Sequence, residues 1–217
     1  MVSTGWCRGI VASAVVVTGL VGSANAQDEA TEILNRVHQK YETVTDAEVK
    51  FTQKTKFSLG KVSQSVAGVL TMKKANHYRA ELGDQIVVTD GTTVWSYSAA
   101  TKQVIIDRFK LDERTVTPER ILTGSPTGFT PTLVGRELLG KTPVVQIKLL
   151  PKDDQSLIAV MRLWVDEKEW MIHQAEIEDV NGKKTTYTIQ QIRLNIGVPD
   201  ARFTFQPPHG TEAVDLR

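Results

Sequence analysis

The pattern of hydrophobic and polar positions first predicts an amphipathic helix over residues 29–44. In DEATEILNRVHQKYETV, apolar side chains recur every three or four residues and so fall along one stripe of a helix. Asp28 is suited to cap the N-terminus, and acidic residues follow in the first turn. His38 lies at the edge of the stripe, where we expect a partly buried surface side chain. The stripe consists of Ala30, Ile33, Leu34, Val37, Tyr41 and Val44.

After residue 46 the period changes to two, which predicts β-strands. Glycine-containing turns at Asp90-Gly91, Gly140-Lys141 and Asn181-Gly182 separate several of the alternating segments. About ten short strands at hairpin spacing predict one long antiparallel meander. The segments lie at 48–54, 69–73, 86–89, 94–97, 104–106, 129–138, 143–150, 159–165, 171–177, 185–194 and 203–205.

Two further local signals complete the predicted elements. Thr117 followed by Pro118 is a helix start, so we expect a short helix near 118–123 between strands. Near the C-terminus, Phe203-Thr204-Phe205 is interpreted as a last strand that ends at the pair Pro207-Pro208.

A curved sheet that buries one face needs a cover, and helix 29–44 is the one long amphipathic element predicted. A meander wrapped around a helix either fills its interior with side chains or leaves it hollow. Methionine and aromatic side chains suit an adaptable apolar pocket, although the same stripe is also typical of core packing. The candidate cavity residues are Ile33, Leu34, Val37, Tyr41, Phe51, Leu70, Met72, Trp95, Tyr97, Met161, Leu163, Met171 and Ile177.

The segment GRELLGKT at 135–142 matches the phosphate-binding pattern G-x-x-x-x-G-K-[ST]. A working phosphate loop connects a strand to a helix whose N-terminus faces the phosphates. Here Pro143 and the alternating VVQIKLL follow, which predicts a strand instead. We therefore interpret Gly140-Lys141-Thr142 as the turn of a hairpin between strands 129–138 and 143–150.

The N-terminus indicates export. Residues 1–26 combine Arg8, an apolar run from Ile10 to Val21 and an A-x-A site at Ala24–Ala26, the pattern of a secretory signal peptide. We therefore expect one domain over 27–217 and a soluble, periplasmic product. The single cysteine, Cys7, lies in the predicted signal peptide, so no disulfide or thiol chemistry is expected in the mature chain.

Composition and motifs point away from nucleic acid and catalysis. The net charge is +1, from 26 basic and 25 acidic residues without a basic patch or tail. The four histidines show no metal-ligand spacing, and no G-x-S-x-G motif occurs. We expect no metal, no cofactor and no enzymatic activity.

Four stretches, in this order, resemble the periplasmic outer-membrane lipoprotein carrier family (LolA). They are VKFTQK (49–54), GVLTMKKANHYR (68–79), IVVTDGTTVWSY (86–97) and RFTFQPPHGTEAVD (202–215). The resemblance implies an α+β fold, an incomplete and strongly curved antiparallel β-barrel of about 10–11 strands closed by a helical lid around an apolar cavity. It also implies a monomeric carrier of acylated lipoproteins. Its implied partners are an inner-membrane ABC exporter and an outer-membrane acceptor.

One position departs from the family's pattern. The family's motif is roughly K-R-P-x-x-[FY], and its arginine holds the lid through hydrogen bonds to backbone. Here Lys74 stands at the arginine position and Ala75 at the proline position. Lysine lacks the planar fork of arginine. The resemblance therefore leaves three interpretations of the latch: a weaker latch at Lys74, a latch at Arg79, or a divergent relative with other cargo.

Two alternatives to the lipoprotein carrier share the predicted fold. The first is a periplasmic sensor or regulatory module, which typically has a second domain or an anchor. The second is a general carrier of other lipids.

Overall fold

The computed structural model describes residues 21–57, 63–110 and 128–217. Across these ranges the chain forms one α-helix, one short 3-10 helix and a single sheet of twelve strands. The helices are α1 (Val21–Glu42) and η1 (Asp200–Phe203). The strands are β1 (Asp46–Lys56), β2 (Ser63–Lys73), β3 (His77–Leu82), β4 (Gln85–Asp90), β5 (Thr93–Ser98), β6 (Gln103–Arg108), β7 (Phe129–Leu139), β8 (Thr142–Pro151), β9 (Ile158–Asp166), β10 (Met171–Asp179), β11 (Lys184–Leu194) and β12 (Glu212–Asp215).

The strand order confirms the predicted antiparallel meander and shows how its two halves join. The order is β12-β6-β5-β4-β3-β2-β1-β11-β10-β9-β8-β7. β1 pairs with β2 on one side and with β11 on the other, so that Ala47 lies opposite Leu194. β12 and β7 are the two edges of the sheet. The sheet is therefore open and does not close into a barrel.

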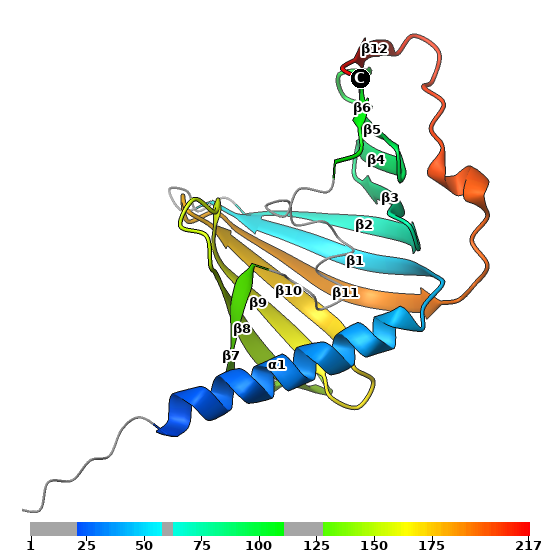
Figure 1. The fold of residues 1–217 in the computed structure, drawn as a ribbon. Coiled ribbons are helices and arrows are strands. Elements are labelled where there is room, and N and C mark those ends of the chain that lie inside the picture. The colour runs from blue at the N-terminus through cyan, green and yellow to red at the C-terminus, as the bar shows by residue number, and fades with distance from the viewer. Residues whose placement is uncertain (1–20, 58–62, 111–127) are drawn as a thin grey trace, which may run out of the picture.

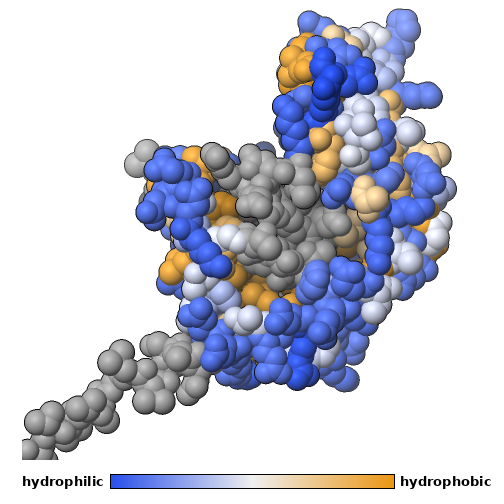
Figure 2. Space-filling view, in the orientation of Figure 1, coloured by the Kyte–Doolittle hydropathy of each residue, from blue (hydrophilic) through white to orange (hydrophobic). Residues whose placement is uncertain are grey.

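The sheet is strongly curved and has two parts (Figure 1). Strands β2, β1, β11, β10, β9, β8 and β7 form a curved wall, and β3 to β6 with β12 form an arm that stands up from it. α1 crosses the open side of the wall and makes most of its strand contacts with β7 and β10. In Figure 2, hydrophobic residues are visible on this side of the molecule, and hydrophilic residues cover the surface around them.

Helix α1 is confirmed as an amphipathic element, but its limits differ from the predicted 29–44. It begins at Val21 and ends at Glu42. The start is earlier because the preceding stretch, VGSANAQ, contains no proline, so backbone hydrogen bonding continues upstream. Asp28 therefore lies inside the helix and does not cap it. At the other end, Val44 N–H donates to Tyr41 O at 2.9 Å, which places Val44 in the closing turn.

The predicted glycine turns are confirmed by positive backbone φ angles. Gly91, Gly140 and Gly182 have φ of 83°, 65° and 76°, a region that glycine enters without steric cost. Thr142 then starts β8, which pairs with β7 along the predicted hairpin. The segment that matches the phosphate-loop pattern is therefore strand and turn, with no helix after it.

The prediction of a last strand at 203–205 is wrong. This segment forms η1 and extended chain instead, and Pro199 precedes η1. Prolines 199, 207 and 208 each lack an N–H, so the segment donates poorly to a ladder. Phe203 is fully buried, with its ring edge-on to His77 at 5.5 Å between centroids. The last strand is β12, parallel to β6. The predicted helix near 118–123 lies outside the described residues.

A buried carboxylate, that of Asp46, stabilises the connection between the end of α1 and the start of β1. Asp46 is 5% exposed, and its Oδ1 accepts the backbone N–H of Ile196 at 2.8 Å and of Gly197 at 3.1 Å. Asn195 Oδ1 accepts the N–H of Thr45 at 2.8 Å. These bonds hold the start of β1 against the exit of β11, and so fix the position from which α1 departs.

Replacing Asp46 with Ala should destabilise the fold by about 2–3 kcal/mol, because two backbone N–H groups lose a charged acceptor. Urea unfolding followed by circular dichroism measures the change. Asp154→Ala is the control, since Asp154 is exposed in the β8–β9 turn and its loss should cost at most about 0.5 kcal/mol. Equal stability of Asp46→Ala and the parent chain would show that this connection does not depend on the carboxylate.

Candidate functional site

We call the face of the wall beneath α1 the inner face. Its buried residues form one hydrophobic cluster with the helix. Ile33, Leu34, Val37 and Tyr41 of α1 are between 0% and 7% exposed. Their spacing puts them on one side of the helix, toward the sheet. Burial of this stripe is the main favourable term that holds α1 in place, because apolar area removed from water contributes roughly 25 cal/mol per Å².

The structure brings most of the candidate cavity residues together in this cluster. Phe51 and Ile177 are partly buried and pack against it. The residues within it are Ile33, Leu34, Val37, Tyr41, Leu70, Met72, Met161, Leu163 and Met171.

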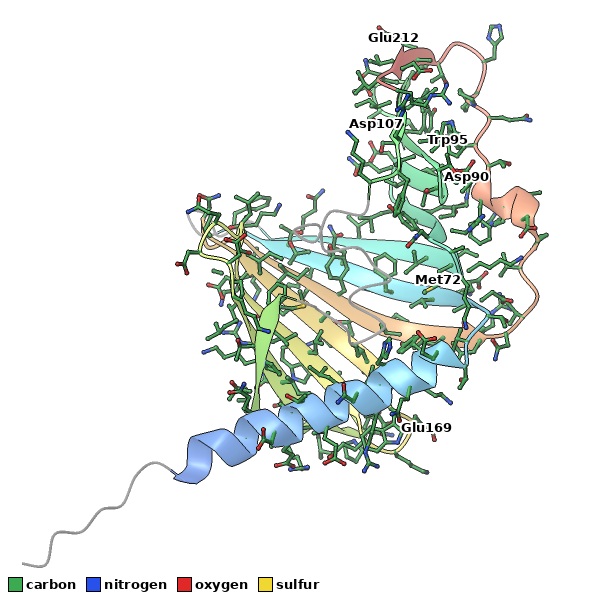
Figure 3. The ribbon with its side chains drawn as sticks, viewed as in Figure 1. Met72, Asp90, Trp95, Asp107, Glu169 and Glu212 are labelled. Carbon is green, nitrogen blue, oxygen red and sulfur yellow. The ribbon has the colours of Figure 1, made fainter. Side chains whose placement is uncertain are left out.

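Trp95 and Tyr97 lie elsewhere. Both are on β5, in the arm, whereas Met72 lies on the wall (Figure 3). The Tyr97 ring contacts Phe205 instead, with ring centroids 5.3 Å apart. The sharp rise of the arm separates these aromatic side chains from the cluster, and sequence periodicity carries no signal for that bend.

The sequence interpretation missed the part of the cluster that β8 contributes. Val145, Ile147 and Leu149 are fully buried there. Their alternation in VVQIKLL is the signal for a strand, but periodicity alone does not say which face of which strand meets the helix.

A polar contact fastens the C-terminal end of α1. The Lys74 ammonium donates to the Glu42 carbonyl oxygen at 2.8 Å, and Lys74 N–H donates to Thr45 O at 3.2 Å. Positive φ angles at Ala75 (66°) and Asn76 (59°) form the tight β2–β3 turn that directs Lys74 toward the helix. Lys74 thus contacts helix-end backbone, the type of partner that the resemblance implies for the latch position.

Arg79, the other predicted latch residue, lies elsewhere. Its Nε donates to Glu81 Oε1 on the same strand, and Arg202 reaches the same carboxylate at 3.4 Å. Among the interactions described for Arg79, none joins it to α1.

A second polar contact fastens the N-terminal half of α1. Arg136 on β7 donates to Glu29 of α1 and to Glu167 in the β9–β10 turn, each at 2.8 Å. These two carboxylates, Glu167 first, raise the pKa of the Arg136 guanidinium above its usual value. Arg136 is half-exposed, so solvent screens both pairs. Arg136 lies inside GRELLGKT, at a position that the phosphate-loop pattern leaves unspecified, so the sequence pattern gives no reason to select it.

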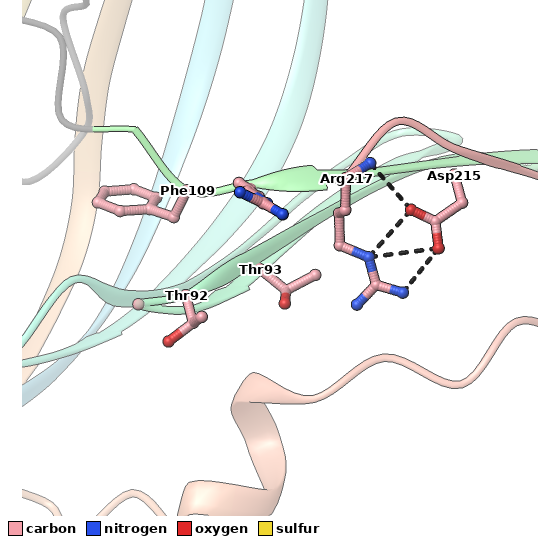
Figure 4. Close-up of a pocket in the computed structure, with 7 residues that line it drawn as sticks. Thr92, Thr93, Phe109, Asp215 and Arg217 are labelled. Carbon is pink, nitrogen blue, oxygen red and sulfur yellow. Dashed lines mark hydrogen bonds and ion pairs between the residues drawn. The ribbon is translucent and has the colours of Figure 1, made fainter.

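Two surface pockets are described, and neither lies between α1 and the inner face. One, of about 790 Å³, lies by the β4–β5 turn and the C-terminus (Figure 4). Arg217 there pairs with Asp215 at 2.7 Å and lowers the pKa of Asp215 to about 2. The other, about 580 Å³, lies beside Arg36 and Trp170, whose ring is 4.9 Å from the Arg36 guanidinium carbon. The predicted apolar cavity beneath α1 stays a prediction.

Within the described ranges, no cluster of three or more His, Cys, Asp or Glu side chains could hold a metal ion. In the same ranges, no helix has the length and apolarity needed to cross a membrane.

The sequence model of the family described as "Outer membrane lipoprotein carrier protein LolA" matches residues 42–206, most of the chain. The chain belongs to this family. Its members are known as carriers, which bind and transport rather than catalyse.

Similar proteins in the family cover nearly the same length as this LolA-family chain. An outer-membrane lipoprotein carrier protein of Azotobacter vinelandii is 26% identical over 197 residues, which cover 88% of this chain and 90% of the relative. One of Pseudomonas putida strain GB-1 is 26% identical over 212 residues, with 95% and 97% covered. An uncharacterised conserved protein from Thermus thermophilus shares the fold, with a TM-score of 0.59, 15% identity and coverage of 86% and 99%.

Replacing Lys74 with Met should loosen the C-terminal end of α1, because the Glu42 carbonyl loses its charged donor. We expect amide hydrogen exchange of Thr43 and Val44 to accelerate about three- to tenfold. Lys73→Met is the matched control, since Lys73 pairs with Asp200 near η1 and not with α1. If the amide hydrogens of Thr43 and Val44 exchange at the same rate in Lys74→Met as in the parent chain, Lys74 has no latch role and is a solvated turn residue.

Proposed function

We propose that this chain carries acylated lipoproteins across the periplasm and shelters their acyl chains between α1 and the inner face. The observation that supports this most is the way α1 is held. An apolar stripe covers an open, curved sheet. Polar contacts hold the helix at its C-terminal end, through Lys74, and in its N-terminal half, through Arg136.

Such an arrangement suits reversible opening. Exposed ion pairs contribute about 0–1 kcal/mol each, so the Arg136 contacts resist opening only weakly. The larger cost of opening is the exposure of the α1 stripe and the inner face to water. Acyl chains that enter the same space cover both surfaces again, and each buried methylene contributes about 0.8 kcal/mol. The ligand thus replaces the contact that it breaks.

Non-directional apolar contact also permits release. Side chains such as Met72, Met161 and Met171 adapt to chains of different shape, since methionine is flexible and polarisable. Cargo then moves toward whichever acceptor offers more apolar contact. We propose that an inner-membrane ABC exporter loads the carrier and that an outer-membrane acceptor receives the cargo from it. We also propose that the carrier acts as a monomer.

The proposed export of the chain is compatible with the contacts that hold α1. Removal of residues 1–26 at the predicted site would shorten α1 at its N-terminal end. Both polar contacts and the whole buried stripe, from Ala30 onward, lie after that point. The proposed periplasmic form therefore keeps the buried stripe and both polar contacts.

The test is transfer from membranes to solution. The purified chain is mixed with inner-membrane vesicles that hold the exporter, ATP and a triacylated lipoprotein, and the vesicles are then sedimented. We expect a soluble one-to-one complex. Val37→Glu should lose it, because a charge enters the buried stripe. Asn35→Glu, on the exposed side of the same helix, should retain it.

Circular dichroism checks that Val37→Glu keeps its sheet, and Leu34→Ala provides a milder second variant. If the parent chain leaves the lipoprotein in the vesicles but extracts phospholipid, a general lipid carrier is the better description. If it extracts neither, the carrier proposal is wrong.

A further inference from the structure

One polar atom in the hydrophobic cluster has no partner. The Tyr41 hydroxyl is buried and makes no hydrogen bond, and the whole residue is only 5% exposed. Tyr41 lies on the α1 stripe that faces the inner face, one turn after Val37. In the described chain, the one other buried side-chain atom in this condition is Nδ1 of His38, three residues earlier on α1.

This arrangement costs stability. A buried hydroxyl without a hydrogen bond costs about 1–3 kcal/mol relative to one that is paired. Phenylalanine at position 41 would fill the same space without that cost. Buried polar groups in native proteins are otherwise nearly always paired, so an unpaired one calls for a partner that the described residues do not supply. The cluster around Tyr41 consists of apolar side chains in the described ranges, so a bound ligand is a natural source of that partner.

The carbonyl group of an acyl chain has the required chemistry. An acyl ester or amide carbonyl accepts hydrogen bonds, and an ester has no donor of its own. Such a ligand therefore needs a donor from the protein when its carbonyl is carried into an apolar site. Burial raises the pKa of Tyr41 above its usual value, so the hydroxyl stays protonated and available as a donor.

We infer that the Tyr41 hydroxyl donates a hydrogen bond to an acyl carbonyl of the bound lipid and so selects acyl esters over plain alkyl chains. This inference rests on the proposed function and deepens it.

The position of Tyr41 also gives the ligand a direction. Tyr41 directly precedes Glu42, whose carbonyl accepts from Lys74, so the carbonyl end of the ligand lies beside the latch contact. From there the stripe continues through Val37, Leu34 and Ile33 to Ala30 with apolar side chains. Tyr41 to Ala30 spans roughly 16 Å at 1.5 Å per residue, which accommodates most of a fatty acyl chain.

The test compares two synthetic peptides whose N-terminal cysteine carries, on its sulfur, a glycerol with two sixteen-carbon chains and has no amide-linked acyl chain. One has natural ester links to glycerol, and the other has ether links in their place. Binding to the delipidated chain is measured by titration calorimetry. We expect the parent chain to prefer the ester peptide and Tyr41→Phe to bind it about three- to tenfold more weakly, as the loss of one hydrogen bond predicts. Affinity for the ether peptide should be equal in both chains.

Tyr97→Phe is the matched control, because it removes the same atom from a ring on β5, in the arm, that contacts Phe205 and lies away from the cluster. It should keep the preference for the ester. Thermal unfolding without ligand gives an independent readout, since Tyr41→Phe should melt at the same or a higher temperature than the parent chain.

The possible failures are distinguishable. If the parent chain binds both peptides equally and Tyr41→Phe changes neither affinity, the carrier function stands and the role of Tyr41 is refuted. If the parent chain binds neither peptide, the proposed function is refuted together with this inference.

Discussion

The contact between the apolar stripe of α1 and the inner face of the open sheet is the interaction on which the rest of the structure depends. A sheet of twelve strands that does not close leaves one apolar face to be covered, and α1 supplies a cover for it. The helix itself is stabilised mainly by this packing, as is usual for amphipathic helices in proteins. Anything that separates the two surfaces must therefore offer comparable apolar contact.

The polar interactions around this contact divide into two kinds. Asp46 is part of the fixed scaffold, because its buried carboxylate joins the start of β1 to the exit of β11. Lys74 and Arg136 bind α1 from exposed positions, where water can replace them at low cost. The chain thus combines a fixed frame with a helix that is held mainly by apolar contact and only weakly by polar contacts.

The sequence predicts the elements of the fold better than their arrangement. Alternation and glycine turns identify nearly all the strands, because a half-buried strand leaves a period of two in the residues themselves. The pairing of β1 with β11 joins segments almost 140 residues apart, and local sequence patterns carry no signal for it. The prediction of a strand at 203–205 is wrong because it relies on the alternation of Phe203 and Phe205 and gives too little weight to the prolines nearby. The actual last strand, β12, is not predicted because four residues are too few to show a period.

The candidate site follows the same division. Periodicity correctly places Ile33, Leu34, Val37 and Tyr41 on one buried stripe, since that depends on local geometry alone. It could not exclude Trp95 and Tyr97, because their distance from the cluster results from the bend between wall and arm. It also could not identify the contact between Arg136 and Glu29, which are 107 residues apart in the sequence. Nor could it show that the Tyr41 hydroxyl is unpaired, since that depends on which side chains surround it in the fold.

The most direct measurement of the central claim is the distance between α1 and the sheet with and without cargo. The chain from residue 27 onward has no cysteine of its own. Spin labels attached to it at Asn35→Cys, on the exposed side of α1, and Lys50→Cys, on β1, report this distance by double electron–electron resonance. The account predicts a longer and broader distance distribution when a triacylated peptide is bound. An unchanged distribution in a chain shown to be saturated with that peptide would contradict the claim that acyl chains enter beneath α1.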